Sequence, residues 1–440
     1  MKLINALLTI AITVMVAALA MQGRFELATL AFVAGGAITF GLNHTPQSRA
    51  AGDCFANTLT NLIPDFYAAL DVVSRELTGF IPAVQRDPRA DRCALNASMR
   101  SPVAPANSAA GNVTPAMALP SAADQTIGNK EFTIQKSRFA PFSWTGEEQG
   151  SVDTGAGYLT IQQDQIAQAI RTLSNEIEAD IATYGYLGAS RAYGTTAGTA
   201  PVLADFANAK KILDDNCAPM SDRHAVIDTT AGVALRGTSN LFKVNEAGDS
   251  SLLRQGILGN LYGMDIRESA QVQTPTAGAM ASATSSSAAF TVGQTVIPLA
   301  TAGTGVVAAG DIITFANDTN KYVVASVSFA GANPASGDTI TLAAPGLRKA
   351  QGAATRAITV FATSARNLVF SRNSILLGTR LPALPKEGDL ATDHQIITDP
   401  RTGLSFELSC YPGYRMVTYH VSIAWGVLVV KPEHLATIIG

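Results

Sequence analysis

The chain has 440 residues, 47% of them apolar and only 15% charged, so two or three domains with a sizeable core are expected. Its 31 basic and 34 acidic residues leave a net charge of −3, which excludes a global positive field that could hold a nucleic-acid backbone. Aromatic residues make up 7% of the chain, so stacking platforms for bases or sugars are not expected either.

The N-terminal segment is strongly apolar. Leu3–Gln22 carries no charge, and its length matches the roughly 20 residues that cross a bilayer. A second uncharged stretch, 27–42, is shorter and contains two adjacent glycines. Three interpretations stay open: a membrane segment or signal peptide, an over-extended translation start, and a buried structural hairpin.

The next region combines one helical pattern with extended chain. Apolar residues at helical spacing predict a helix over 57–84, and the charged run 86–92 predicts a solvated turn. The segment 101–123 is rich in Pro, Ala, Ser and Asn and predicts an extended arm or loop. Alternation over 130–136 predicts a strand, which could form a long projecting hairpin with the extended piece 139–144.

The strongest helical pattern covers 158–193. A single apolar stripe runs along about six turns, which suits a long helix lying across a sheet. The stripe consists of Ile166, Ile170, Leu173, Ile177, Ile181 and Tyr184. The opposite face is predicted to carry Asp164, Arg171, Glu176, Glu178 and Asp180.

Mixed elements follow. The patterns predict an amphipathic helix over 205–215 and a short buried strand over 225–228. A further helix is expected to begin at 250–255, and 261–268 is typical of a strand. Ala, Ser, Thr and Gly make 274–289 a linker.

A change in composition between Ala281 and Phe361 predicts a compact all-β insert whose first and last strands lie close together. Its Thr-, Val- and Ile-rich runs are separated by turn residues. The candidate strands are 290–299, 311–315, 321–329, 339–342 and 357–361. After the insert, strands are predicted at 367–370, 404–409, 415–424 and 427–430, followed by a short helix or tail over 431–439.

No catalytic, cofactor-binding or metal-ligating residue is predicted. The chain lacks a nucleophile elbow, a phosphate-binding glycine loop and a paired-histidine zinc motif. Asp214 and Asp215 are interpreted as a helix end, and His224 as a structural histidine. The glycines of 303–306 lack a strand–helix context. The remaining candidate ligands are too scattered for a zinc site: Cys54, Cys93, Cys217, Cys410, His44, His394, His420 and His434.

Five segments, in order, resemble the major capsid (coat) proteins of tailed bacteriophages with the HK97-like fold, and in particular the short-tailed-phage branch with an inserted β-domain. ANTLTNLIPDFYAALDVVSRELTGFIPAV is similar to the family's N-terminal arm. GNKEFTIQKSRFAPFSWTGEEQG resembles the extended loop, and IQQDQIAQAIRTLSNEIEADIATYGY the spine helix. LLRQGILGNLYGMDIRESAQV resembles a glycine-punctuated turn before a strand. The final TDPRTGLSFELSCYPGYRMVTYHVSIAWGVLVVKPEHLATIIG resembles the closing strands.

The resemblance implies an α+β fold with a long spine helix, an extended loop, peripheral and axial domains, and an inserted small all-β domain that is Ig-like or barrel-like. The implied division is a hydrophobic extension (1–54), the arm (55–100), the extended loop (101–157), the spine helix and peripheral domain (158–197), the first axial part (198–280), the insert (281–361) and the closing strands (362–440). The family has no counterpart of Met1–Asp53, which favours an over-extended start. Functional protein is then expected to begin near Ala56, and deleting the first 54 residues should leave assembly unchanged.

By the same resemblance, the chain is expected to assemble, without enzymatic activity or cofactors, into the icosahedral shell of a tailed bacteriophage or prophage. The implied partners are copies of itself in hexamers and pentamers, a scaffolding protein, a portal, and packaged double-stranded DNA bound without sequence specificity. The protein would be made in the host cytoplasm and end in the virion. The alternative is a membrane-anchored bacterial surface or periplasmic protein with an Ig-like adhesion module.

Overall fold

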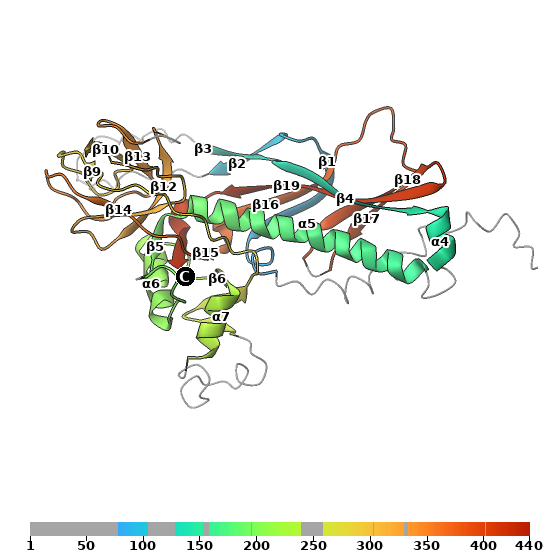
Figure 1. Ribbon diagram of the computed structural model, residues 1–440, viewed down its shortest axis with the longest axis horizontal. Helices are drawn as coiled ribbons and strands as arrows, with labels where there is room; N and C mark the ends of the chain where they lie inside the picture. The colour runs from blue at the N-terminus through green and yellow to red at the C-terminus, as the bar shows by residue number, and fades with distance from the viewer. Residues whose placement is uncertain are drawn as a thin grey trace, which may run out of the picture. The chain divides into compact units, whose positions relative to one another are not determined.

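The computed structural model describes residues 78–103, 128–152, 158–194, 196–238, 258–301, 303–329, 333–400 and 402–440 (Figure 1). The predictions for the apolar N-terminal segment, for the helix before Thr78, for most of the loop 101–123 and for the helix at 250–255 lie outside these ranges. Within them, no helix is both long and apolar enough to span a membrane.

The first sheet is organised around one long strand. Its described strands are β1 (Gln85–Cys93), β4 (Lys136–Thr145), β16 (Ile375–Pro382), β17 (Asp393–Thr398), β18 (Ser405–Gly413) and β19 (Met416–Val429). One edge of β19 pairs with β4, and the other edge pairs with β18 in its first half and with β16 in its second. β17 lies beside β18, and β1 runs parallel to β16. The predicted strands 415–424 and 427–430 are therefore a single strand.

The predicted hairpin of 130–136 and 139–144 is wrong. β3 (Gly128–Thr133) pairs instead with β2 (Ser98–Val103), and β4 pairs with β19. The chain changes partner at Gln135, whose backbone N–H donates to the Trp425 carbonyl (3.0 Å) and whose side chain bonds both the N–H and the C=O of Val427. A side chain at Gly426 would meet the Thr133 carbonyl at 2.1 Å, so only glycine permits this close approach.

The charged run 86–92 was also predicted wrongly, because it lies in strand β1 and is not a turn. Its charges have partners far away in the sequence. Arg380 Nη2 lies 2.8 Å from Asp87 Oδ2, and Arg92 forms two hydrogen bonds with Glu407. Charge content alone does not reveal a strand whose charges are paired across a sheet.

The long helix α5 (Tyr158–Gly188) confirms the predicted apolar stripe. Ile166, Ile170, Leu173, Ile177 and Ile181 are all at most 2% exposed, and the helix contacts β19 and β4 along the first sheet (Figure 1). Tyr184 is only half-buried. The prediction for Glu178 is wrong: it is 1% exposed because residues 79–81 and Ser269 cover that part of the helix.

The second sheet contains β5 (Arg191–Tyr193), β6 (Arg223–Ile227), β7 (Asn260–Leu261), β8 (Met264–Glu268), β15 (Arg366–Ser371) and β20 (Leu435–Ile439). Two helices, α6 (Leu203–Asp215) and α7 (Thr229–Arg236), contribute to a core with it. The helix over 205–215 and the strand over 225–228 are confirmed, whereas α7 was not predicted. The predicted terminal helix or tail is wrong: after a single 3-10 turn, β20 pairs with β15 on one side and β5 on the other.

The segment 281–361 has a core of its own. The described strands there are β9 (Thr284–Ser285), β10 (Val296–Thr301), β11 (Ile312–Phe315), β12 (Lys321–Val327), β13 (Thr339–Leu342) and β14 (Ile358–Val360). Every side chain of its core cluster lies between Met280 and Val360, and Ser285 N–H donates to the Arg356 carbonyl at 2.9 Å near the two ends of the segment. However, β12 also pairs with β5, so the second sheet continues into this segment. Its status as an inserted domain stays a prediction.

Candidate assembly surface

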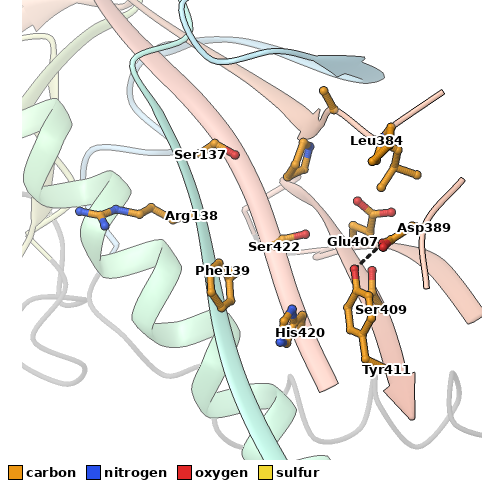
Figure 2. Close-up of a pocket in the computed structure, with 13 residues that line it drawn as sticks. Ser137, Arg138, Phe139, Leu384, Asp389, Glu407, Ser409, Tyr411, His420 and Ser422 are labelled. Atoms are coloured by element: carbon orange, nitrogen blue, oxygen red, sulfur yellow. Dashed lines mark hydrogen bonds between the residues drawn. The ribbon is translucent and has the colours of Figure 1, made fainter. Parts of the chain in front are cut away.

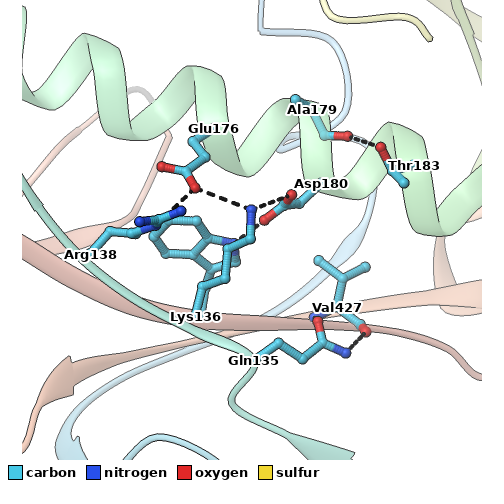
Figure 3. Close-up of polar contacts among 9 residues, drawn as sticks. Gln135, Lys136, Arg138, Glu176, Ala179, Asp180, Thr183 and Val427 are labelled. Atoms are coloured by element: carbon cyan, nitrogen blue, oxygen red, sulfur yellow. Dashed lines mark hydrogen bonds and ion pairs between the residues drawn. The ribbon is translucent and has the colours of Figure 1, made fainter. Parts of the chain in front are cut away.

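Strand β4 is fastened to α5 by charged side chains on one of its faces (Figure 3). Lys136 Nζ lies 3.1 Å from Glu176 Oε1 and 2.9 Å from Asp180 Oδ1. Burial acts to lower the pKa of Lys136, but its hydrogen bonds to Asp180 and Glu176 outweigh burial and raise that pKa above 10.5. Asp180 Oδ2 also accepts a 2.8 Å hydrogen bond from Nε1 of the buried Trp425. These contacts join α5, β4 and β19.

We expect Asp180→Ala to destabilise the subunit by about 1–3 kcal/mol, because it leaves the indole N–H of Trp425 buried without an acceptor. Glu176→Ala is the matched control. It removes two partly exposed ion pairs, with Lys136 and Arg138, from the same helix face and should cost only about 0–1 kcal/mol. Denaturant unfolding of both variants measures the difference, and equal losses would contradict this role of Asp180.

The opposite face of the first sheet is polar and aromatic. Side chains of directly opposed residues share a face, and the pairs Glu407–Ser422, Ser409–His420 and Ser422–Phe139 place the residues of β18, β19 and β4 together. A pocket of about 230 Å³ lies on this face (Figure 2). Its remaining wall is formed by the segment after β16, including Leu384 and Asp389.

The pocket wall is held in place by a chain of polar contacts. Tyr411 donates its hydroxyl to Asp389 Oδ2 at 2.5 Å, and this hydrogen bond lowers the pKa of Asp389. Burial, followed by the same hydrogen bond, raises the pKa of Tyr411 to about 12. Glu407, 2% exposed, accepts both Arg92 bonds and lies 3.2 Å from His394 Nδ1. The segment that connects β16 to β17 is therefore tied to the sheet at Asp389.

Aromatic rings line the other side of the pocket. The His420 ring stacks on Phe139 with centroids 4.8 Å apart and is equally close to the Tyr411 ring. Burial lowers the pKa of His420, although Asp389 opposes this shift. Although its ring stacks on His420, Phe139 is 57% exposed.

Large apolar side chains are also exposed on strands and connections of this sheet. Leu390, just after Asp389, is 89% exposed, and Tyr414, in the β18–β19 turn, is 91% exposed. Ile396, on β17, is also exposed, and among the described strands β17 pairs with β18 alone. Exposed apolar patches mark interaction surfaces. We name Phe139, Leu384, Leu390, Ile396, Tyr414 and Met416 the apolar rim.

The residues weighed as catalytic candidates occupy ordinary structural positions. Asp214 and Asp215 end α6 and pair with Arg223 (2.6 Å) and Arg191 (3.6 Å). His224 is 1% exposed within β6, and burial lowers its pKa. Cys93, Cys217 and Cys410 are free thiols, whereas Cys54 and His44 lie outside the described ranges. No group of His, Cys, Asp and Glu side chains in those ranges could hold a metal ion.

The pocket residues were missed from the sequence. The signal present was alternation: Glu407, Ser409 and Tyr411 lie two residues apart on one strand and therefore share one face. Alternation alone cannot show that residues near 384–390 complete a pocket with them, because that connection depends on tertiary contacts.

No protein-family model and no curated protein matches the chain. Solved structures do. The chain is similar to the capsid structure of the cyanophage P-SCSP1u, with a TM-score of 0.46 and 12% identity over 83% of this chain and 88% of that one. It is similar to the mature capsid of bacteriophage PhiM1, with a TM-score of 0.42 and 11% identity over 82% and 86%. A structure from Mycobacterium phage Che8 matches with a TM-score of 0.40 and 13% identity over 79% and 88%. The solved structures to which this chain is similar include phage capsids.

Proposed function

We propose that this chain is a major capsid protein, a structural protein without enzymatic activity that self-assembles into the icosahedral shell of a tailed bacteriophage or prophage. The observation that carries the proposal is the apolar rim, because its side chains stand on ordered strands and turns and yet remain in water in a lone subunit. Repeated contacts between copies would bury them.

The physical character of the chain supports the same proposal. Five buried apolar side chains and the contacts of Asp180 hold the long helix α5 against the first sheet, so these two elements support each other. A net charge of −3 suits a wall that encloses double-stranded DNA without binding it tightly. In this proposal the copies form hexamers and pentamers, with a scaffolding protein and a portal during assembly. Residues 281–361 are an inserted domain at the outer surface.

The experiment is to express the full chain, alone and with the proteins encoded beside it, and to sediment the lysate. We expect closed particles on the order of megadaltons, seen by electron microscopy of the fast-sedimenting fraction. Recovery of the chain only in the membrane fraction would favour the anchored surface protein, and a soluble monomer under both conditions would refute the capsid role.

A further inference from the structure

We infer that strand β17 pairs along its open edge with β17 of a second copy of this chain, in antiparallel orientation about a two-fold axis at Ile396. This inference rests on the proposed shell function and names one contact through which copies associate. The contact joins the first sheets of two subunits into one continuous sheet.

The backbone groups of every second residue of β17 point away from β18. Asp399 N–H donates to the Leu404 carbonyl at 2.9 Å, in the same register as the β17–β18 pairing, so the odd-numbered residues form the hydrogen-bonded pairs with β18. The even-numbered residues form the closer, non-hydrogen-bonded pairs, in which side chains meet: Thr398 Oγ1 lies 3.1 Å from Ser405 Oγ. The N–H and C=O groups of the even-numbered residues therefore face the open edge.

This edge is open and carries nothing that blocks pairing. His394, Ile396 and Thr398 present their backbone groups there, and no other described strand pairs with them. Proteins usually protect such an edge with Pro, Lys or a bulge, but β17 contains neither residue, and its register with β18 is unbroken. Ile396, at the centre, is 53% exposed. An edge of this kind is suited to accept another strand.

The edge is its own complement, which is why the occupant is a second β17. In an antiparallel hydrogen-bonded pair, each residue donates its N–H and accepts with its C=O. A two-fold axis at Ile396 sets Ile396 opposite its own copy and His394 opposite Thr398 of the other chain, so all three outward-facing residues are paired. An axis at Gln395 or Ile397 leaves one of the three without such a partner in β17. The arrangement also packs two exposed isoleucines together, and a symmetric contact is the common way for copies to associate.

The first test removes an outward-facing N–H without removing a bond to β18. Ile396→Pro should lower the particle yield at least about tenfold, because both N–H groups of the central pair are lost and the ring obstructs the edge. The unassembled subunit should unfold at an unchanged temperature, since an edge strand tolerates proline where its N–H faces solvent. Ile396→Val keeps the N–H and should assemble normally.

Ile397→Pro is the comparison variant, because the Ile397 N–H faces β18 and its loss should destabilise the subunit itself. If Ile396→Pro destabilises the subunit as much as Ile397→Pro does, the Ile396 N–H does not face outward and the inference is wrong. Normal particle yield from Ile396→Pro would also overturn the inference, while leaving the capsid role intact.

The second test identifies the partner and the register. Particles of Ile396→Cys are treated with a short bifunctional thiol reagent, and we expect a covalent dimer well above that of the unsubstituted chain, which controls for the native free cysteines. His394→Cys and Thr398→Cys should each give little dimer alone and much more when the two variants are co-assembled, because these positions are opposed only in the antiparallel pair.

The two tests together separate the possible failures. Reduced yield from Ile396→Pro without these crosslinks would show that another segment occupies the edge, which would overturn the pairing of β17 with itself. Failure of the unsubstituted chain to form particles would instead refute the proposed function, and this inference with it.

Discussion

Ile177→Asp should abolish assembly and leave little folded subunit. Ile177 is completely buried in the middle of the apolar stripe of α5, where the helix lies along the first sheet. The substitution removes apolar burial and places a carboxylate at a fully buried position of the apolar stripe, which costs several kcal/mol. Because domains are stable by only about 5–15 kcal/mol, the loss removes most of the margin.

Gln168→Asp is the matched control for this experiment. It introduces the same carboxylate into the same helix, but at an exposed position. Soluble yield, circular dichroism and particle counts should be close to those of the unsubstituted chain for Gln168→Asp and severely reduced for Ile177→Asp. Normal particles from Ile177→Asp would show that α5 does not brace the sheet.

Glu178→Leu is expected to have the second-largest effect. The buried Glu178 carboxylate accepts hydrogen bonds from Phe80 N–H (3.0 Å), Ile81 N–H (2.7 Å) and the Ser269 hydroxyl (3.0 Å). Leucine would leave three donors without an acceptor, each at about 1–3 kcal/mol, so a total loss of roughly 3–6 kcal/mol is expected. Residues 78–84, which this carboxylate joins to α5, should become sensitive to limited proteolysis.

Glu178→Gln is the companion variant, because its amide oxygen retains one acceptor. It should lose less stability than Glu178→Leu and keep residues 78–84 protected. If Glu178→Leu unfolds at the same denaturant concentration as the unsubstituted chain, the three hydrogen bonds do not anchor this segment.

The pair also predicts a pH dependence. Burial raises the pKa of Glu178 above its ordinary value of 4.5, although the hydrogen bonds oppose this shift. The folded state therefore binds a proton more readily than the unfolded state. The corresponding stability is fully present below pH 4.5 and is lost as the pH rises through the folded-state pKa. The unfolding free energy of the original chain minus that of Glu178→Gln should fall as pH rises from 4.5. A constant difference in urea titrations across this range would contradict the raised pKa.

The sequence by itself determined the elements whose faces differ in polarity. The apolar stripe of α5 can be recognised from the sequence of this helix alone, because its apolar residues recur every three or four positions. In the structure, all five isoleucine and leucine positions of the stripe are buried. The strand at 339–342 was predicted with the bounds that β13 has. Local alternation and turn residues carried that information.

Tertiary structure alone decided the elements whose partners are distant. β20 pairs with β15 on one edge and with β5 on the other, and all of its residues are buried. Its sequence therefore shows no alternation of apolar and polar residues, so it was predicted as a helix or tail. Arg92 and Glu407 are 315 residues apart, yet they pair, and this pairing makes a charged segment part of a strand. Glu178 has polar neighbours in the sequence, which suggests an exposed position. It is buried because residues 79–81, distant in the sequence, pack against this part of α5. The pocket beside Leu390 arises in the same way, from strands and a turn that contact one another only after the chain has folded.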